Sequence, residues 1–502
     1  MALRLLSALD IARTQYYHFK AIIIAGMGLF TDAYDLFCLP PIMTLIARVY
    51  YHDYEVPLRT SSAMVVVALF GTSIGQLVFG YLGDRFGRRR VYGLALLLMV
   101  ASSVGCGFSL CKSKGCVLGS LVFFRFWLGM GIGGDYPLSA TIMSEFANRR
   151  TRGAFIAAVF SMQGMGILAA STVTMAVCHL FYAKGVKNDK ADLVWRIILM
   201  IGAIPAALTF YWRLKMPETA RYTALVERNV QQAAINVESV LQVPLDQIGK
   251  DDDFSPNSSS SYRLFSKQFL RHHGRDLFSC ATAWLLVDIV FYGANLVQYK
   301  VNDQYISNVK SDQSKVNPYK DAFNVAKLQA LIALCSTIPG SWATVYFVDR
   351  IGRVKIQIIG FFFLSLTLFA MGIPYGYWSN SDNHKKGKLF VVLYGMVFFF
   401  CNFGPNTTTF IVPAELFPAR FRSTCHGISG AVGKVGAMIG SLLFVCASNS
   451  YKNKKEDENK VKLMRATLVV MGVICLVGMM VTYLYTRETK GRSLEENENG
   501  DE

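Results

Sequence analysis

Charged residues are scarce in this sequence. They make up 17% of its 502 residues, whereas hydrophobic residues make up 53%, and the mean hydropathy is +0.34. Soluble globular proteins are typically about 45–50% apolar and about 25% charged. The composition therefore excludes an ordinary soluble domain. It predicts a membrane protein with many helices of about 20 apolar residues, the length that crosses the hydrocarbon core.

The sequence also lacks the groupings that enzymes and metalloproteins use. We find no spacing of histidine, cysteine and acidic residues that suggests a metal site, and no nucleophile beside a base. The glycine-rich run 129–134 has no strand before it, so it indicates close helix packing rather than nucleotide binding. Most of the eleven cysteines fall within apolar runs, while Cys111 and Cys116 flank a short loop and fit either a disulfide or a reduced pair. We therefore predict no enzymatic activity, no metal and no cofactor.

Basic residues outnumber acidic ones, and the formal net charge is +17. They form short clusters between the hydrophobic runs instead of one basic patch, which argues against nucleic-acid binding. Such clusters are typical of loops that set membrane topology and contact anionic lipid headgroups. The segment Met1–Lys20 has neither the hydrophobic region nor the cleavage site of a signal peptide.

Hydrophobic stretches between charged or Pro/Gly breaks predict twelve membrane spans, hence an all-α membrane protein. A hydrophilic segment with an Asp251–Asp253 run and a Ser258–Ser261 run separates the sixth span from the seventh, which predicts a linker that is first helical and then disordered. The predicted spans are 20–48, 62–83, 91–111, 117–141, 153–181, 195–214, 277–299, 324–348, 355–377, 389–412, 423–447 and 464–485. The predicted domains are an N-terminal half (1–215), a cytoplasmic linker (216–276), a C-terminal half (277–486) and a cytoplasmic tail (487–502).

Two charged motifs recur in register. Asp-Arg-Phe-Gly-Arg at 84–88 follows span two, and Asp-Arg-Ile-Gly-Arg at 349–353 follows span eight. Glu145 and Arg152 follow span four, as Glu415 and Arg422 follow span ten. The repetition predicts two pseudo-symmetric six-helix halves, the major facilitator layout. Because these charges lie at span ends, we expect a gating network there rather than substrate contact. Its members are Asp84, Arg88, Glu145, Arg152, Asp349, Arg353, Glu415 and Arg422.

Ionisable residues inside membrane spans are costly, so they are functional candidates. Asp32 and Asp35 lie three residues apart in span one and share a helix face. Span four carries Arg125 and Asp135, for which the alternative is a structural pair that holds the span against a neighbour. The later spans carry Asp288 and Lys434.

Span seven gives the clearest pattern for a substrate site. Trp284, Asp288 and Tyr292 are spaced four residues apart, so one stripe of the helix carries an indole, a carboxylate and a phenol. A lipid-facing helix would not carry that stripe, whereas a helix beside a polar cavity between the two halves would. Tyr136, Gln163 and Asn402 offer further hydrogen-bonding groups in other spans.

The segment Gly133–Glu145 (Gly-Gly-Asp-Tyr-Pro-Leu-Ser-Ala-Thr-Ile-Met-Ser-Glu) resembles the signature of the plant and fungal phosphate:proton symporters of the major facilitator superfamily. The resemblance extends to Phe30–Phe37, Gly153–Gly166, Trp284–Tyr292 and Asn402–Gly427, and it covers nearly the whole chain. The plant branch is the more similar one.

The resemblance implies proton-coupled uptake of inorganic phosphate, and of its mimic arsenate, across the plasma membrane, with both termini in the cytoplasm. It assigns substrate binding to Tyr136, Gln163, Trp284, Asp288, Tyr292 and Asn402. It associates Asp32, Asp35 and Asp135 with proton movement alongside Asp288, and it places Lys434 along the anion path. We also assign Arg125, the basic residue within span four, to the anion path. The alternatives are a symporter of sugar or another organic solute, and a membrane sensor that binds phosphate without transporting it.

Asp288 suggests how proton and anion would be coupled. At about 4 Å, two like charges repel by roughly 4 kcal/mol at an effective dielectric constant near 20. An ionised Asp288 would therefore disfavour phosphate, and a protonated Asp288 would admit it. Alternatively, the charged carboxylate accepts a hydrogen bond from a phosphate hydroxyl, with the proton held nearby. Either arrangement links anion binding to proton binding.

Overall fold

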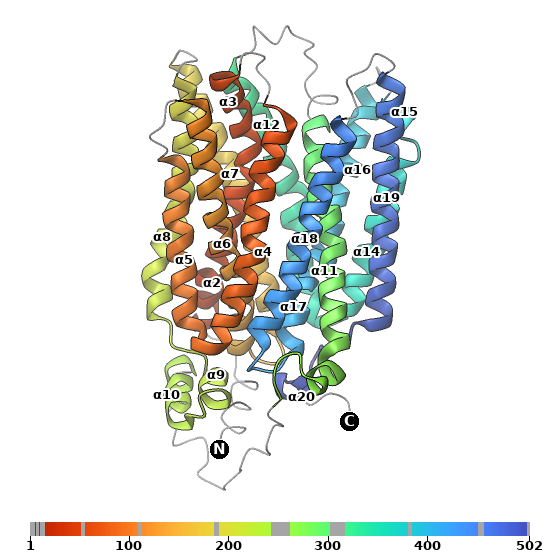
Figure 1. Ribbon diagram of the computed structural model, residues 1–502. Coiled ribbons are helices and arrows are strands. Elements are labelled where there is room, and N and C mark those ends of the chain that lie inside the picture. The colour runs from red at the N-terminus through yellow and green to blue at the C-terminus, as the bar shows by residue number, and fades with distance from the viewer. Residues whose placement is uncertain are drawn as a thin grey trace.

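The computed structural model describes residues 6, 10, 16–51, 56–108, 113–184, 190–241, 262–301, 317–379, 384–449 and 456–498. These residues form helices and no strands, arranged as two bundles of long, roughly parallel helices (Figure 1). Eleven membrane-length apolar segments lie among them, and α18 is the twelfth long helix. This confirms the all-α prediction, and the long helices account for the twelve predicted spans.

The N-terminal bundle consists of α2 (Tyr16–Phe37), α3 (Leu39–Tyr50), α4 (Leu58–Phe86), α5 (Arg88–Gly107), α6 (Lys114–Phe146), α7 (Arg152–Ala183) and α8 (Ala191–Lys215). The short helices α9 (Ala220–Leu225) and α10 (Val230–Leu241) follow it. The C-terminal bundle consists of α11 (Lys267–Val301), α12 (Pro318–Ile332), the π-helix η5 (Ala333–Thr337), α13 (Ile338–Ile351), α14 (Arg353–Gly372), α15 (Tyr375–Ser379), α16 (His384–Asn402), α17 (Pro405–Leu416), α18 (Arg422–Asn449) and α19 (Glu456–Tyr485). The tail contains α20 (Leu494–Glu498).

Three predicted spans are interrupted helices. The first divides into α2 and α3 at Cys38, just before Pro40 and Pro41, whose backbones have no N–H to donate. The eighth contains the π-helix η5, and the tenth breaks between α16 and α17 at Gly404. Interrupted helices are tolerated at membrane depth only where other protein or a polar cavity satisfies the backbone. These breaks therefore direct attention to the interior of the bundle.

The largest displacement of a predicted boundary is at the start of the seventh span. The seventh span was expected to begin at residue 277, but α11 begins at Lys267. Because the first ten residues of this helix include Arg271 and His272, they are too polar to be recognised as part of a hydrophobic span. The acidic and serine runs predicted for the linker lie outside the described residues.

Two glycines mark matching turns in the two halves. Gly87, between α4 and α5, has a φ of 94°, and Gly352, between α13 and α14, has a φ of 110°. L-residues with a side chain rarely adopt such angles, so glycine is favoured at both turns. A Cβ atom at either position would also lie 2.6 Å from Glu218 Oε2 or 2.5 Å from Glu488 Oε2. The repeated motif thus has a repeated backbone geometry.

The two ends of the bundle differ in what covers them. The helices α9, α10 and α20 lie at one end, called here the α20 end, and α3, α12 and α15 lie at the opposite end, called here the α3 end (Figure 1). Cys116, near the start of α6 at the α3 end, is disulfide-bonded. Cys111, for which the sequence left a disulfide with Cys116 and a reduced pair both open, lies outside the described residues.

Candidate substrate site

A polar cavity lies between the two halves of the protein. Side chains from α6 and α7 of the N-terminal half line it together with side chains from α11, α17 and α18 of the C-terminal half. Its lining consists of Tyr136, Phe160, Gln163, Trp284, Asp288, Phe291, Tyr292, Asn406 and Lys434. Five of the six residues expected to bind substrate therefore meet at one place, although they come from segments far apart in the sequence.

Asp288 and Lys434 form the charged centre of this cavity. Lys434 Nζ lies 3.1 Å from Asp288 Oδ2 and 3.3 Å from the Tyr292 hydroxyl oxygen, and it also lies 5.1 Å from the centre of the Tyr136 ring. All four side chains are buried. The sequence argument considered the Asp288 carboxylate alone. In the structure this carboxylate has a cationic partner, so the ionised pair carries almost no net charge. An anion that enters the cavity therefore meets a free ammonium group only when Asp288 is not paired with Lys434.

Aromatic rings pack against Trp284, which lines the cavity. The Trp284 and His426 rings are 5.3 Å apart and nearly perpendicular, and Phe410 lies at the same distance from His426. His426 Nε2 lies 3.0 Å from the Phe410 carbonyl oxygen. Gly433 makes room for Trp284, because a Cβ atom at position 433 would come within 2.5 Å of the indole. The indole position therefore depends on close contact between α11 and α18.

Asn402 lies one helical turn away from the cavity lining. Its Nδ2 donates to the Phe398 carbonyl oxygen at 2.8 Å, and its Oδ1 accepts from Asn406 Nδ2 at 2.9 Å. Asn406 itself lines the cavity. In this conformation Asn402 orients Asn406, and the sequence analysis did not select Asn406. Asn402 and Asn406 lie on either side of the helix break at Gly404, and this break sets the positions of both side-chain amides.

The first-span acids occupy two different environments. Asp32 interacts electrostatically with Tyr136 and Lys434, so it lies on the side of the central cavity. Asp35 accepts a hydrogen bond from Ser103 Oγ at 3.3 Å, and its backbone carbonyl accepts one from Arg125 Nη1 at 2.7 Å. Arg125, which was expected along the anion path, lines neither this cavity nor the cavity lined by Phe37 and Gln329.

Asp135 pairs with Arg213, which the sequence analysis did not select. The Arg213 Nη1 to Asp135 Oδ1 distance is 2.5 Å, and the guanidinium lies 3.9 Å from the centre of the Tyr92 ring. This buried pair joins α6 to α8, while Arg125 joins α6 to α2. The two charges of span four thus contact different neighbouring helices and do not pair with each other.

The span-end charges form buried networks at the α20 end. In the N-terminal half, Arg88 lies 3.2 Å from both Asp84 and Glu145. In the C-terminal half, Arg353 lies 2.9 Å from Asp349 and 2.7 Å from Glu415. The repeated motifs therefore build the same arginine–double-carboxylate unit twice.

A third repeat completes each unit. Thr219 donates a hydrogen bond to Glu145, and Thr489 donates one to Glu415. Glu218 accepts from the backbone N–H of Arg88, as Glu488 accepts from that of Arg353. The Pro217-Glu218-Thr219 and Arg487-Glu488-Thr489 segments carry these contacts. The similarity of the two Glu-Thr pairs was the available signal, and the sequence analysis did not use it.

Other contacts join the two halves at the α20 end. Arg422 Nη1 lies 2.9 Å from Glu145 Oε1, Asp84 accepts from the backbone N–H of Thr424 at 2.7 Å, and Asp349 accepts from that of Ala154 at 2.7 Å. Arg152, the remaining member of the predicted network, lies 2.6 Å from Asp10.

The tail adds a second layer over these contacts. Glu498 lies 3.2 Å from Arg422 and accepts from the backbone N–H of Ala419 at 2.6 Å, while Glu495 lies 2.9 Å from Arg221. Through these contacts α20 connects the C-terminal half to α9.

Comparison with known proteins agrees with this architecture. A family model described as "Sugar (and other) transporter" matches residues 21–500. The chain belongs to this family of membrane transporters. It is not an enzyme family.

Individual proteins that are similar to this chain give a more specific comparison than the family model. The chain is 58% identical to the probable inorganic phosphate transporter 1-8 of Arabidopsis thaliana, covering 99% of this chain and 95% of that protein. It is 50% identical to the low affinity inorganic phosphate transporter 1 of Petunia hybrida, covering 100% and 97%. A solved structure of a double-Trp mutant of XylE, a proton:xylose symporter in the major facilitator superfamily, superposes with a TM-score of 0.75. It covers 96% of this chain and 98% of that one, at 20% identity, and so supports the fold alone.

Proposed function

We propose that the protein is a proton-coupled symporter that carries inorganic phosphate into the cell through the plasma membrane by alternating access. The relatives at 50–58% identity are named inorganic phosphate transporters, which supports the substrate. The observation that carries the mechanism is the buried Asp288–Lys434 pair in a cavity lined by both halves. Tyr136, Gln163, Trp284 and Tyr292 complete the binding site, with Asn406 oriented by Asn402.

The pair links the two substrates by competition for Lys434. An ionised Asp288 occupies the ammonium and leaves the cavity without a free positive charge. A proton on Asp288 removes that competitor, so Lys434 and the Tyr292 hydroxyl become available to the anion. Since the proton increases the affinity for phosphate, phosphate must increase the affinity for the proton by the same factor. That reciprocal coupling is the requirement for symport.

The remaining acids extend a proton route from the cavity. Asp32 is nearest to the charged centre through its interactions with Tyr136 and Lys434, and Asp35 and Asp135 lie in the same N-terminal half. Arg125 and Arg213 hold the last two acids against neighbouring helices and so position them. We assign these residues to proton transfer rather than to phosphate binding.

The orientation follows from the two ends. Loops with Arg88–Arg90 and Arg149–Arg150 lie at the α20 end, and cytoplasmic loops are enriched in Lys and Arg. The disulfide-bonded Cys116 lies at the α3 end, and disulfides persist in oxidising compartments. We therefore assign the α20 end, and both termini, to the cytoplasm.

Uptake into proteoliposomes tests the proposal. Radiolabelled phosphate should accumulate when the exterior is made acidic and should only equilibrate without a proton gradient. Arsenate should compete with phosphate, whereas sulfate should compete weakly because it has no proton to donate at neutral pH. Phosphate binding without flux would instead support a sensor. Phosphate accumulation that does not depend on the proton gradient would contradict the coupling described above. Equal competition by sulfate would contradict it as well.

A further inference from the structure

The helix α4 of the N-terminal half packs along α18 of the C-terminal half, and the two lie side by side in Figure 1. One face of α4 makes this contact, because its contacting residues recur every three or four positions. We call the contact the α4–α18 seam. It consists of Ser73, Gln76, Gly80 and Asp84 on α4, and of Thr424, Gly427, Gly430 and Ala431 on α18. The seam is part of the boundary along which the two halves would separate.

The seam lies between the central cavity and the α20 end. The helix α18 begins at Arg422, which contacts Glu498 of α20, and it runs from there toward the α3 end. Gly430 therefore lies about 12 Å along the helix from Arg422 and about 6 Å, one turn, before Lys434. A phosphate ion that leaves Lys434 toward the α20 end passes this level. The two halves must therefore part here when that end opens.

Most polar side chains of the seam have partners. Ser73 Oγ donates to the Ala431 carbonyl oxygen at 3.2 Å, and Thr424 Oγ1 donates to Asp84 Oδ2 at 2.6 Å. Gln76, which lies between these two contacts, is the exception. Its side chain is buried, and neither its Nε2 nor its Oε1 has a hydrogen-bond partner among the described residues. The whole amide is thus unsatisfied while the seam is closed.

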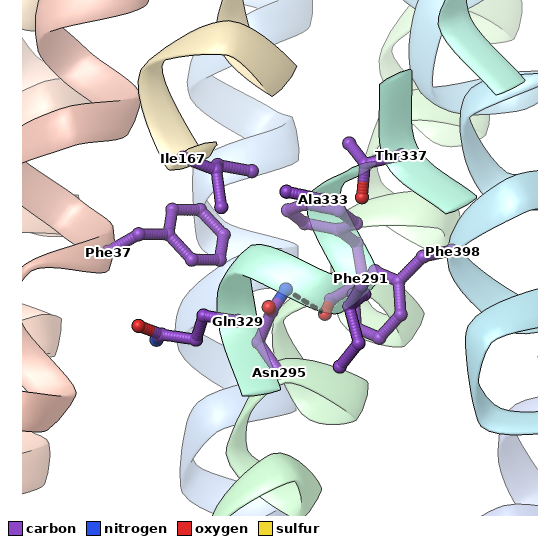
Figure 2. A pocket seen from close by; sticks show the side chains of 9 residues that line it. Phe37, Ile167, Phe291, Asn295, Gln329, Ala333, Thr337 and Phe398 are labelled. Carbon is purple, nitrogen blue, oxygen red and sulfur yellow. Dashed lines mark hydrogen bonds between the residues drawn. The ribbon is translucent and has the colours of Figure 1, made fainter. Parts of the chain in front are cut away.

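The glycines of α18 explain why Gln76 finds no partner. A Cβ atom at Gly430 would lie 2.7 Å from Gln76 Nε2, and one at Gly427 would collide with the Gln76 carbonyl oxygen. The amide therefore faces a surface without side chains, and the backbone groups of α18 bond within the helix itself. Gln329 is also buried with an unpartnered oxygen, but it borders the cavity lined by Phe37 (Figure 2), whereas Gln76 lines neither cavity.

An unpaired buried amide disfavours the conformation that contains it. The desolvation penalty applies only while the seam is closed, since water can hydrogen-bond to the amide once α4 and α18 separate. Contacts such as Arg422 with Glu145 act in the opposite direction and hold the α20 end closed. Alternating access requires conformations that differ little in free energy, so the stabilising contacts of the closed end need an opposing contribution.

We propose that Gln76 is a release residue: its unsatisfied amide destabilises the closed α4–α18 seam and so favours the opening that releases phosphate at the α20 end. This inference rests on the alternating access of the proposed function. It assigns a conformational role to a residue outside both the substrate site and the charged networks. Removing the amide should therefore favour the conformation with the α20 end closed.

Gln76→Met tests the release residue, with Gln357→Met as a matched control. Methionine has nearly the length of glutamine but carries no group that needs a hydrogen-bond partner. Gln357 is also buried, but its Nε2 donates to Thr482 Oγ1 and its Oε1 accepts from Thr408 Oγ1, both at 2.8 Å, within the C-terminal half. The control therefore removes a satisfied amide that lies outside the seam.

Spin labels on the full-length protein in lipid vesicles measure the separation of the halves. Arg90→Cys and Lys355→Cys carry the labels, because both residues are exposed and occupy equivalent places after the repeated motifs. Cys335, which is exposed, is replaced by serine so that it does not take up label. Pulsed electron paramagnetic resonance, with and without phosphate, then gives the ratio of molecules with the α20 end open to molecules with it closed.

For Gln76→Met we expect this ratio to fall about tenfold, the effect of one unsatisfied group removed from the closed state. Its unfolding temperature should not fall. Gln357→Met should lower the unfolding temperature and change the ratio by less than about twofold.

A ratio that stays the same or rises in Gln76→Met would overturn the release residue. If the halves separate in the unmodified protein but Gln76→Met does not change the ratio, the release residue alone fails. If the labels report no separation in any of these proteins, alternating access fails, and the proposed function fails with it.

Discussion

Replacing Asp288 by asparagine separates the two roles that the central pair would play. Asparagine has the size of aspartic acid but carries no charge at any pH, so it imitates the protonated residue permanently. At the observed distance of 3.1 Å, Asp288 attracts Lys434 by about 5 kcal/mol at an effective dielectric constant near 20. An incoming phosphate must compete with that attraction when Asp288 is ionised. In Asp288→Asn the competition is absent.

The gain in phosphate affinity is smaller than this gross attraction. The anion must still be desolvated, and the ionised pair is itself a stable arrangement. If roughly a quarter of the attraction survives as a difference in binding free energy, Asp288→Asn binds phosphate about tenfold more tightly than the unmodified protein when Asp288 is ionised. When Asp288 is protonated, the two proteins should bind alike. The variant should also fail to accumulate phosphate against a gradient, because it cannot carry the coupled proton.

Equilibrium binding of radiolabelled phosphate to purified protein measures this difference. The affinity ratio of variant to unmodified protein is followed from about pH 5.5 to about pH 8, so that the ionisation of phosphate itself cancels in the ratio. The ratio should rise with pH. Asp276→Asn is the control, because Asp276 is a buried acid on the same helix that pairs with Arg487 at 3.1 Å, far from the cavity. Its ratio should stay flat.

A flat ratio for Asp288→Asn would refute the competition for Lys434, even if transport were lost. Full proton-driven accumulation by the variant would refute the assignment of the coupled proton to Asp288. A lower affinity at all pH values would show that Asp288 binds phosphate directly as a charged acceptor. These three results are distinguishable in the same two assays.

The remaining predictions concern the other partner of the pair and the tail. Lys434→Met should abolish phosphate binding and lower the free energy of unfolding by about 3–5 kcal/mol, because it leaves Asp288 buried without its cation. Thermal unfolding measures this loss, and adding Asp288→Asn to Lys434→Met should restore the stability. Burial raises the pKa of Glu498 from 4.5 to about 7, although Arg422 lowers it. The protonated carboxyl is therefore favoured when α20 is docked, so docking should weaken as the pH rises from about 4.5 to about 7 and then level off. In hydrogen-exchange measurements corrected for intrinsic rates, the amides of α20 should lose up to about 3 kcal/mol of protection over that range. Glu498→Gln should remove this pH dependence. Greater protection at higher pH would show that the charged form docks better.

Hydrophobicity alone was enough to predict the spans, because a backbone in lipid must satisfy its hydrogen bonds internally and only long apolar helices do so. The repeated motifs at 84–88 and 349–353 predicted the two halves for a comparable reason. A buried arginine needs its carboxylates at fixed positions, so the pattern survives in both copies. The stripe of Trp284, Asp288 and Tyr292 indicated a polar wall, and the structure places all three on one cavity.

Pairings between distant segments could not be predicted in the same way. Lys434 and Asp288 lie on different helices, and nothing in either local sequence specifies which face of α18 meets α11. The same holds for Asp135 and Arg213. Asn402 and Asn406 are one turn apart, so the choice between them depends on where the helix breaks at Gly404. Gln329 gave no periodic signal either, and its buried oxygen without a partner among the described residues is visible only in the packed structure.

The repeated charge units have a consequence for opening. Each half keeps its own buried arginine–glutamate contact, Arg88 with Glu145 and Arg353 with Glu415, so neither half is left with an isolated charge when the halves separate. The contacts that must break at the α20 end are those that cross between halves, such as Arg422 with Glu145.

At the α3 end, the ion pair that crosses between halves among the described residues is Arg48 with Asp321, at 3.2 Å, and the Asp321 side chain is 34% exposed. Among the described residues, this partly buried pair is thus the single ion pair across the α3 end, against several ion-pair and backbone contacts across the α20 end. With fewer charged contacts across it, the α3 end should open first from the conformation described here, while the layered contacts of α20 keep the other end closed.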